Sequence, residues 1–242
     1  MRLPRVAGGA RIPKGVRLPR VARGRVPSIH DVTWLRGLET LLFALPPVLG
    51  VGIVGVLEGV VPGPIRFALL GFGTVGYLVI RVGVPLCCYF DARELASAPT
   101  DWHPRPWLYL LTAAAVSPSL VGVIYLHRRH RHVETRSALP VWRYVVWISL
   151  VVPLSGLAVA VLGIAFATPS VVATGLALAG AVALGVFPAS IYKDAAYVRT
   201  RSVAWRPNPG TYLGLAFASI VFAPFQPVVA SYYLVRRRSA GL

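Results

Sequence analysis

Charged residues are scarce in this sequence, and acidic residues are the scarcest of them. Only 14% of the 242 residues are charged, and 8 Asp and Glu stand against 25 Lys and Arg. Soluble domains usually carry about a quarter charged residues, whereas this chain has a mean hydropathy of +0.66. The composition therefore argues against a soluble globular protein and favours one that lies in a lipid bilayer.

Cysteine is nearly absent as well, since the chain has only Cys87 and Cys88, which are adjacent. Neighbouring cysteines rarely form a disulfide, because the bond needs Cα atoms set apart and converging side chains. The sequence therefore excludes a disulfide-stapled domain, and the pair is expected to be two small buried side chains.

Long stretches carry no charge at all, and the longest, 144–192, has 49 uncharged residues. A helix needs about 20 apolar residues to cross a bilayer, so this stretch has room for two crossings and a turn. Helices are expected, because each backbone N–H and C=O must find its partner inside its own segment when water is absent. The sequence predicts an all-α, polytopic helix bundle of about six hydrophobic helices in the cell membrane. The predicted spans are roughly 39–61, 64–89, 107–126, 143–167, 170–191 and 211–235.

Residues 1–32 form a different kind of segment, basic and repetitive, with no acid before Asp31. The string RLPRVA occurs at 2–7 and again at 17–22. Low complexity and high net charge predict a disordered tail. Such a tail, like the Arg-rich loops, can attract anionic lipid headgroups. Its charge could also attract nucleic acid, but a solvated tail that sets orientation is the favoured interpretation, and nucleic acid is not expected as a partner.

An internal repeat is the most specific pattern in the chain. A Pro-x3-Tyr-x-Asp-Ala segment, followed by Trp-x-Pro-x-Pro-x2-Tyr-Leu, occurs twice at an offset of 103 residues. A Tyr-Leu pair before Arg-Arg continues the match, with 125–129 corresponding to 233–237 at an offset of 108. The chain is therefore expected to hold two tandem three-helix membrane repeats, 33–132 and 140–238. The identical pairs are Pro85/Pro188, Tyr89/Tyr192, Asp91/Asp194, Ala92/Ala195, Trp102/Trp205, Pro104/Pro207, Pro106/Pro209, Tyr109/Tyr212 and Leu110/Leu213.

Two topologies fit such a repeat. Three full crossings per repeat would turn the second copy upside down, as in many transporters. Lys and Arg prefer cytoplasmic loops, yet six full spans with the N-terminus inside divide them almost evenly, 14 against 10. If the third segment of each repeat turned back near 117–119 and 224–227, 23 basic residues would share one side. Half of a 20-residue segment is only about 15 Å of helix, so six full spans are the favoured prediction.

Asp91 and Asp194 end the second segment of each repeat and are the main candidates for a polar site. Acids at membrane depth are costly and often carry ions or protons. The favoured interpretation is that they lie at the membrane interface and pair with nearby Arg93 or Arg199.

Arg81 is the third candidate, because it lies inside an apolar segment and has Leu184 as its counterpart in the second repeat. It could line a polar cavity and pair with Glu39 or Glu58, or it could extend towards the membrane surface.

Four aromatic residues are expected to anchor the chain at headgroup level, where amphipathic rings are enriched. They are Trp102, Trp205, Tyr109 and Tyr212.

No enzyme, cofactor or metal site is predicted. The G-x-G-x-x-G patterns at 50–55 and 71–76 lie inside apolar segments rather than between a strand and a helix, so they indicate close helix packing. The histidines of 127–132 alternate with arginines, which repel a cation. We find no nucleophile–base pair, phosphate-binding loop or metal-ligand set in the sequence.

The Tyr-x-Asp-Ala, Trp-x-Pro-x-Pro and Tyr-Leu-x-Arg-Arg strings at 85–132 resemble segments of small, uncharacterised multi-pass membrane proteins of halophilic archaea. The resemblance implies a membrane location and no particular activity. A non-catalytic membrane scaffold or partner subunit is the favoured function, because the spans hold so few polar residues; a protein partner or a homo-oligomer would follow from it. The alternative is a small inverted-repeat transporter or channel that uses Asp91, Asp194 and Arg81.

Overall fold

The computed structural model describes residues 31–56, 62–98, 100–135, 137–202, 204–222 and 225–241. These residues are helical or form short connections, and no strand occurs among them. The predicted tail falls almost wholly outside them, as does Glu58. The helices are α1 (Asp31–Val56), α2 (Gly63–Ala96), α3 (Pro106–Ala115), α4 (Pro118–His132), α5 (Trp142–Ala165), α6 (Pro169–Gly185), α7 (Phe187–Arg201), α8 (Pro209–Val221) and α9 (Phe225–Ser239).

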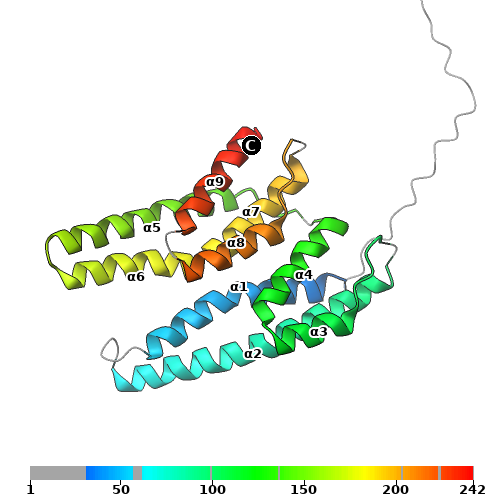
Figure 1. Cartoon of the computed structure of the whole chain (residues 1–242), viewed down its shortest axis with the longest axis horizontal. Helices are drawn as coiled ribbons and strands as arrows, with labels where there is room; N and C mark the ends of the chain where they lie inside the picture. Colours follow the sequence, from blue (N-terminus) through cyan, green and yellow to red (C-terminus); the bar gives the residue numbers. More distant parts are fainter. Residues whose placement is uncertain are drawn as a thin grey trace, which may run out of the picture.

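Two long helical hairpins form the frame. α1 packs along α2, and α5 packs along α6; both hairpins project towards the left in Figure 1. Helices α6 and α7 are separated only at Val186, just before Pro188, which cannot donate an N–H to the preceding turn. In the described part of the chain, four stretches are long and apolar enough to cross a membrane. These are Trp34–Val56, Gly63–Ala96, Trp142–Ala165 and Pro169–Arg201.

Glycines bring the two helices of each hairpin into backbone contact. A Cβ atom on Gly73 would lie 2.7 Å from the Cα of Gly52, and one on Gly156 would lie 2.6 Å from the carbonyl oxygen of Gly175. Any larger side chain would push the helices apart. The interpretation of 50–55 and 71–76 as helix-packing positions is confirmed for Gly52 and Gly73.

We call α1–α4 the first half of the molecule and α5–α9 the second half. The third hydrophobic segment of each half is broken into two short helices. α3 and α4 have 10 and 15 residues, and α8 and α9 have 13 and 15. At 1.5 Å per residue none of them reaches the roughly 30 Å of a hydrocarbon core. The expectation of one continuous helix in each third segment is therefore wrong, and its full crossing stays a prediction. The prediction of about six hydrophobic segments in an all-helical fold is confirmed.

The physical reason for the first break is Pro118. A residue before proline is driven out of the helical region, and Ser117 has φ −163° and ψ 122°. The Ser117 side chain then caps α4 by accepting a hydrogen bond from the Leu120 N–H at 3.4 Å. The break falls where the alternative topology placed its turn.

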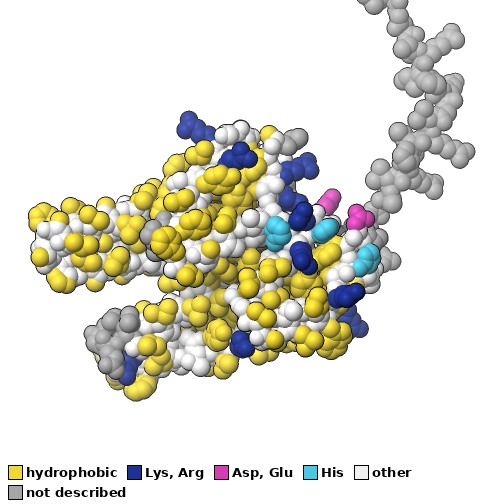
Figure 2. All heavy atoms as spheres, viewed as in Figure 1, with side chains coloured by type: hydrophobic (Ala, Val, Ile, Leu, Met, Phe, Trp, Pro, Cys, Tyr) yellow, Lys and Arg dark blue, Asp and Glu magenta, His cyan; other side chains and the backbone are white. Residues whose placement is uncertain are grey.

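Basic side chains gather at one end of the molecule. Figure 2 shows most of the visible Lys and Arg at the right-hand end, whereas hydrophobic side chains cover the projecting hairpins. In Figure 1, α3 runs away from this end and α4 returns to it, and α8 and α9 do the same in the second half. Both halves thus follow the same course, which agrees with the parallel alternative better than with an inverted one.

Candidate functional site

Asp91 is buried inside the first half, where two side chains of α4 bind it. Its side chain lies near the end of α2 and is part of a residue that is only 1% exposed. Tyr125 donates its hydroxyl to Oδ2 at 2.5 Å, and Arg129 donates Nε to the same oxygen at 2.8 Å. Tyr125 and Arg129 are one helical turn apart, so their side chains share a face of α4. We call these three residues the Asp91 clamp, because they fasten α4 to α2.

The second half has the same arrangement, which we call the Asp194 clamp. Asp194 on α7 is fully buried, and its Oδ2 accepts hydrogen bonds from Tyr233 at 2.7 Å and from Arg237 Nε at 2.8 Å. Tyr233 and Arg237 lie one turn apart on α9. The other oxygen of Asp194, Oδ1, is buried without a hydrogen-bond partner among the described residues.

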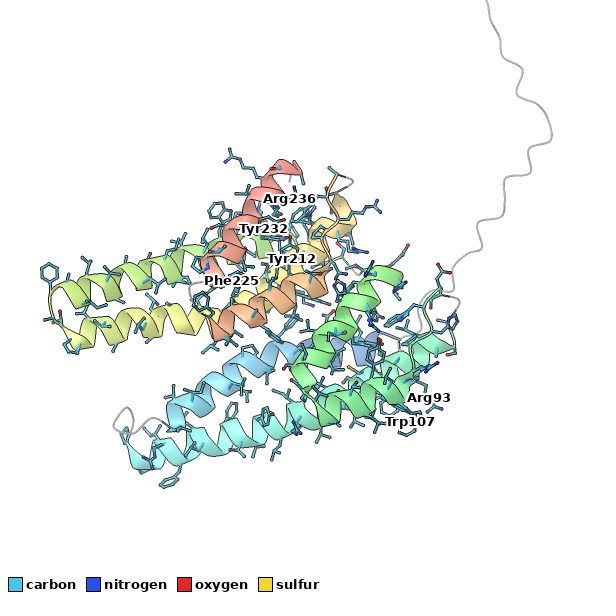
Figure 3. All side chains as sticks on the ribbon, in the orientation of Figure 1. Arg93, Trp107, Tyr212, Phe225, Tyr232 and Arg236 are labelled. Carbon is cyan, nitrogen blue, oxygen red and sulfur yellow. The ribbon has the colours of Figure 1, made fainter. Side chains whose placement is uncertain are left out.

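The partners of the two acids differ from the prediction. Arg93 is exposed on the outer side of α2 (Figure 3), and Arg199 donates to the carbonyl oxygen of His130 at 2.5 Å. The expected pairing with Arg93 or Arg199 is therefore wrong. The partners come from the Tyr-Leu-x-Arg-Arg strings, which the repeat had marked without indicating what they bind.

An aromatic cluster surrounds the tyrosine of each clamp. In the first half, the ring centroid of Tyr125 lies 5.6 Å from Trp102 and 4.8 Å from Tyr109. Such tilted and edge-to-face contacts are favoured between aromatic rings. Tyr109 and its counterpart Tyr212 are only 6% and 7% exposed, so their rings pack inward on the clamps. The corresponding distances in the second half are 5.5 Å for Trp205–Tyr233 and 4.9 Å for Tyr212–Tyr233.

The prediction that these four aromatic residues lie at headgroup level stays a prediction. What the clusters do here is bury the clamp tyrosines. Burial, followed by the neighbouring carboxylate, raises the pKa of Tyr125 and of Tyr233 well above the ordinary value, so each hydroxyl stays protonated and remains a donor.

Arg81 supports the broken segment, and among the described residues it forms no ion pair; its other expected partner, Glu58, lies outside them. Its Nη2 donates to the carbonyl oxygen of Ala114 at 3.2 Å, in the last turn of α3. Pro118, four residues further on, has no N–H to give to that carbonyl, so Arg81 supplies the missing donor. The predicted pairing with Glu39 is wrong, because Glu39 binds residues of α7 instead.

A polar junction joins the two halves. Glu39 on α1 accepts hydrogen bonds from the Tyr192 hydroxyl at 2.9 Å and from Lys193 Nζ at 2.5 Å. The Tyr192 oxygen also lies 2.8 Å from Nε2 of His130. Since the Tyr192 proton goes to Glu39, Nε2 of His130 is assigned as the donor, and Nδ1 accepts from Thr135 at 3.1 Å.

His130 is held neutral in this junction. Burial, followed by the positive charges of Arg129, Arg199 and Lys193, lowers its pKa from 6.5 to about 3. Sequence reasoning missed the junction. The signal that could have indicated it is that Glu39, Lys193 and His130 have Val146, Phe90 and Arg238 at the equivalent positions of the other half.

The start of α8 docks against the end of α4 in a second contact between the halves. Gly210 lies so close to α4 that a Cβ atom would be 2.4 Å from the backbone nitrogen of His127. Asn208 donates its side-chain amide to the carbonyl oxygen of His127 at 2.9 Å, and Thr211 is 2.8 Å from Nδ1 of His127.

No metal site is formed by the side chains that the structure describes, since no three His, Cys, Asp or Glu of that part come together. The three histidines of α4 have separate partners: His127 binds Thr211, His130 binds Tyr192, and His132 stacks on Trp102 at 5.7 Å. The arrangement can hold helices together and can keep two carboxylates away from water.

The chain matches no known protein family, no curated protein and no solved structure. The fold and the site together define a class of protein. It is all-helical, has four stretches able to cross a membrane, and carries a buried Asp–Tyr–Arg clamp in each half.

Proposed function

We propose that this chain is a non-catalytic, multi-pass protein of the cell membrane that serves as a scaffold or partner subunit. The observation that carries the proposal is the state of its buried acids. Asp91 and Asp194 are each bound by an arginine and a tyrosine, and Glu39 is bound by Lys193 and Tyr192. One carboxylate oxygen of Asp91 and of Asp194, and both oxygens of Glu39, thus fasten one helix to another.

The transporter alternative requires acids that exchange an ion or a proton with water. Asp91 and Asp194 are 1% and 0% exposed, and each is paired with an arginine inside the protein. Arg81 completes a helix end. Each residue on which the transporter hypothesis depends thus has a structural partner, which supports the scaffold.

The outer faces of the long helices support a role in association. Phe67 and Val75 on α2 are 68% and 61% exposed, and Val161 and Ile164 on α5 are 63% and 68% exposed. Lipid, or the apolar helices of a partner subunit, would cover such faces. The relation to haloarchaeal membrane proteins is part of the same proposal.

Flux measurements test the proposal directly. The full chain in liposomes is expected to pass protons, Na⁺, K⁺ and Cl⁻ no faster than empty liposomes. Flux in the wild type that is lost in the Asp91→Asn/Asp194→Asn variant, with that variant still folded, would establish the transporter instead.

Association is the second arm of this test. Mild crosslinking in the native membrane is expected to give a complex of constant stoichiometry, either with another protein or between copies of the chain. A clean monomer under these conditions contradicts a scaffold or subunit role.

Topology mapping separates the parallel arrangement from the inverted one. Reporters placed in the 133–141 connection and at the C-terminus are expected to lie on the same side of the membrane. Opposite sides would restore six full crossings and, with them, the inverted repeat that a transporter would need.

A further inference from the structure

The two halves meet through unlike surfaces. The first half uses α1 and α4, whereas the second half uses α6, α7 and α8, with α8 packed on α4 and α6 beside α1. When two similar units meet head to tail, each uses a different surface, so each unit keeps one surface that has no partner. In the second half, the surface without its counterpart is the groove between α5 and α9, which corresponds to the groove between α1 and α4.

The groove of the first half shows what such a groove accepts. Tyr192 enters it, with its ring centroid 5.3 Å from Phe43 and 5.6 Å from His130. Lys193 enters beside it, with Nζ 5.3 Å from the centroid of Phe43 and bound to Glu39. An aromatic wall and an acid thus receive an aromatic ring and a cation.

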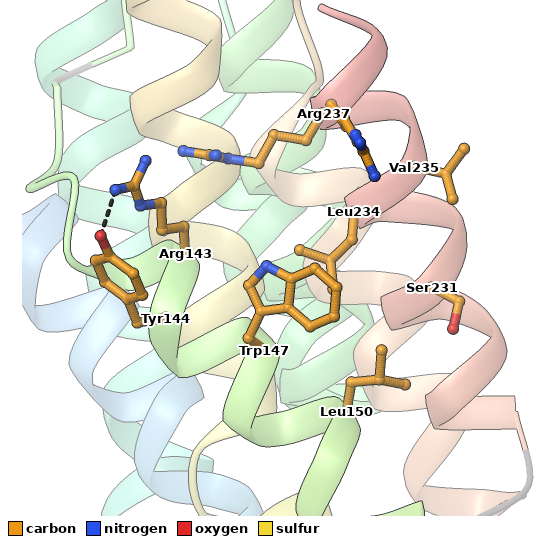
Figure 4. A pocket seen from close by; sticks show the side chains of 9 residues that line it. Arg143, Tyr144, Trp147, Leu150, Ser231, Leu234, Val235 and Arg237 are labelled. Carbon is orange, nitrogen blue, oxygen red and sulfur yellow. Dashed lines mark hydrogen bonds between the residues drawn. The ribbon is translucent and has the colours of Figure 1, made fainter. Parts of the chain in front are cut away.

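The groove of the second half is a cavity of about 540 Å³ between α5 and α9. Figure 4 shows Arg143, Trp147 and Leu150 on α5 facing Leu234 and Arg237 on α9 across it. By the sequence offsets, Leu150 stands where the first half has Phe43, and Arg238, which also lines the cavity, stands where the first half has His130.

The charge of this cavity is the reverse of the charge in the first half. Where the first half has Glu39, the second half has the buried apolar Val146. The exposed Arg238 replaces the buried neutral His130. Arg143, which corresponds to Arg36 of the first half, is a second cation of the lining and is stacked over the Tyr144 ring at 4.4 Å. No acid is among the described residues that line the cavity. This lining favours an occupant that carries negative charge.

We propose that the cavity between α5 and α9 binds the phosphate headgroup of an anionic membrane lipid. Arg143 and Arg238 bind the phosphate, since a guanidinium group matches phosphate oxygens with paired hydrogen bonds. Trp147, 52% exposed, lies one helical turn after Arg143 on α5, and amphipathic aromatic rings are enriched beside lipid headgroups. Arg237 contributes positive charge but is held by Asp194.

The surface next to the cavity favours a lipid over a soluble anion. Beyond Trp147 the face of α5 continues with Ile148 and Val151, which are 55% and 54% exposed. These side chains lead away from the basic end, and acyl chains would cover them. A free phosphate ion would leave them bare.

A second copy of the chain cannot fill the cavity as the second half fills the first. The internal junction needs glycine at 210, where α8 touches the backbone of α4. The first half has Trp107 at that position, 63% exposed and pointing away from the second half (Figure 3). It also has Phe90 in place of Lys193.

Competition between lipids in nanodiscs tests the proposal with the full chain. Discs that contain phosphatidylglycerol and phosphatidylcholine in equal amounts are loaded with protein, and the lipid that the released protein retains is counted by native mass spectrometry. We expect one retained phosphatidylglycerol, and about a tenfold or greater loss of that retention in the Arg143→Gln/Arg238→Gln variant.

The matched control is Arg36→Gln/Arg236→Gln. Arg36 is the counterpart of Arg143 in the first half, and Arg236 is an exposed neighbour of Arg238 outside the cavity lining. This control removes the same charge and is expected to retain phosphatidylglycerol within about twofold of wild type. All three proteins should unfold at the same temperature without added lipid.

Four outcomes overturn the proposal. If the control variant lost phosphatidylglycerol as the cavity variant does, the lipid would be attracted to the basic surface in general. If the wild type retained phosphatidylcholine equally, the charge of the lipid would not determine which lipid is bound. Displacement by inorganic phosphate at the same concentration would mean a soluble-anion site. A dimer that forms in wild type and is lost in the cavity variant would mean that a second copy occupies the groove. These outcomes do not depend on whether the chain is a scaffold.

Discussion

The two halves of the molecule differ least where each is fastened to itself and most where they face one another. Asp91 and Asp194 each bind a tyrosine and an arginine with nearly equal distances. In contrast, the groove between α1 and α4 holds Glu39 and is filled by Tyr192, whereas the groove between α5 and α9 has no acid among its described lining residues and remains open. A duplicated unit can keep the contacts that stabilise it and can still acquire a different surface in each copy.

Substitutions in the two clamps should lower the free energy of unfolding more than any other change, and by the same amount in both halves. Asp91→Asn or Asp194→Asn leaves a buried arginine without its counter-charge, which costs about 3–5 kcal/mol. The free energy of unfolding in mixed detergent micelles measures the loss. Asp101→Asn, at an exposed position, is the control and should change little. A loss below about 1 kcal/mol in one half only would show that the clamps are not equivalent.

The junction should respond to pH through His130. The folded pKa is about 3 and the ordinary value is 6.5, so between these values the unfolded chain binds a proton that the folded chain does not. Stability is therefore complete above about pH 6.5 and falls as the pH decreases, by up to about 1.4 kcal/mol per pH unit.

His130→Gln keeps a hydrogen-bonding side chain and should flatten this dependence between pH 4.5 and 6.5. His103→Gln, at an exposed position, should leave the slope unchanged. Unfolding curves at several pH values decide the matter, and a slope that survives in His130→Gln would assign the pH response to another group.

Gly210 should reveal how closely the halves are packed. Gly210→Ala places a Cβ atom 2.4 Å from the His127 backbone nitrogen, so α8 must move away from α4. We expect a loss of about 1–3 kcal/mol in the free energy of unfolding. Gly180→Ala is the matched control, because a Cβ atom there meets nothing within 4 Å and alanine favours the helix. Equal behaviour of the two variants would contradict a close junction.

Arg81 should give the smallest effect, because its hydrogen bond to Ala114 is exposed. Arg81→Leu introduces the residue that the second half has at 184, and we expect a loss of about 0.5–1 kcal/mol. Arg93→Leu removes an exposed charge from the same helix and should cost less. If both variants unfold alike, the cap on α3 contributes nothing measurable.

Much of the fold could be predicted because its causes are local. The uncharged stretch 144–192 became the α5–α6 hairpin and part of α7, and the turn expected within it lies just before α6 begins at Pro169. Pro118 was visible as a candidate break, but its effect was underestimated in favour of a full crossing. The glycines of the α1–α2 hairpin were assigned to helix packing, and Gly52 and Gly73 are in contact.

The candidate site was only half visible in the sequence. The repeat marked Asp91 and Asp194, and it also marked the Tyr-Leu-x-Arg-Arg strings, but nothing joined the two motifs. Arg93 and Arg199 are closer to the two aspartates along the chain, so they were the expected partners. Arg129 pairs with Asp91 instead, because α4 returns along α2 and its Tyr125 face lies against Asp91.

By itself, the sequence determined an all-helical chain with helices suited to a membrane, and two similar halves of which each carries an aspartate at the end of its second segment. These properties depend on the length and pattern of apolar runs, which act within one helix. Only the tertiary structure decided which arginine pairs with each aspartate, that each third segment breaks into two helices, and that one groove is filled while its counterpart stays open. Those outcomes depend on which helix faces meet, because a buried charge and an apolar groove are stabilised by whatever neighbour the packing brings, however distant it is along the chain.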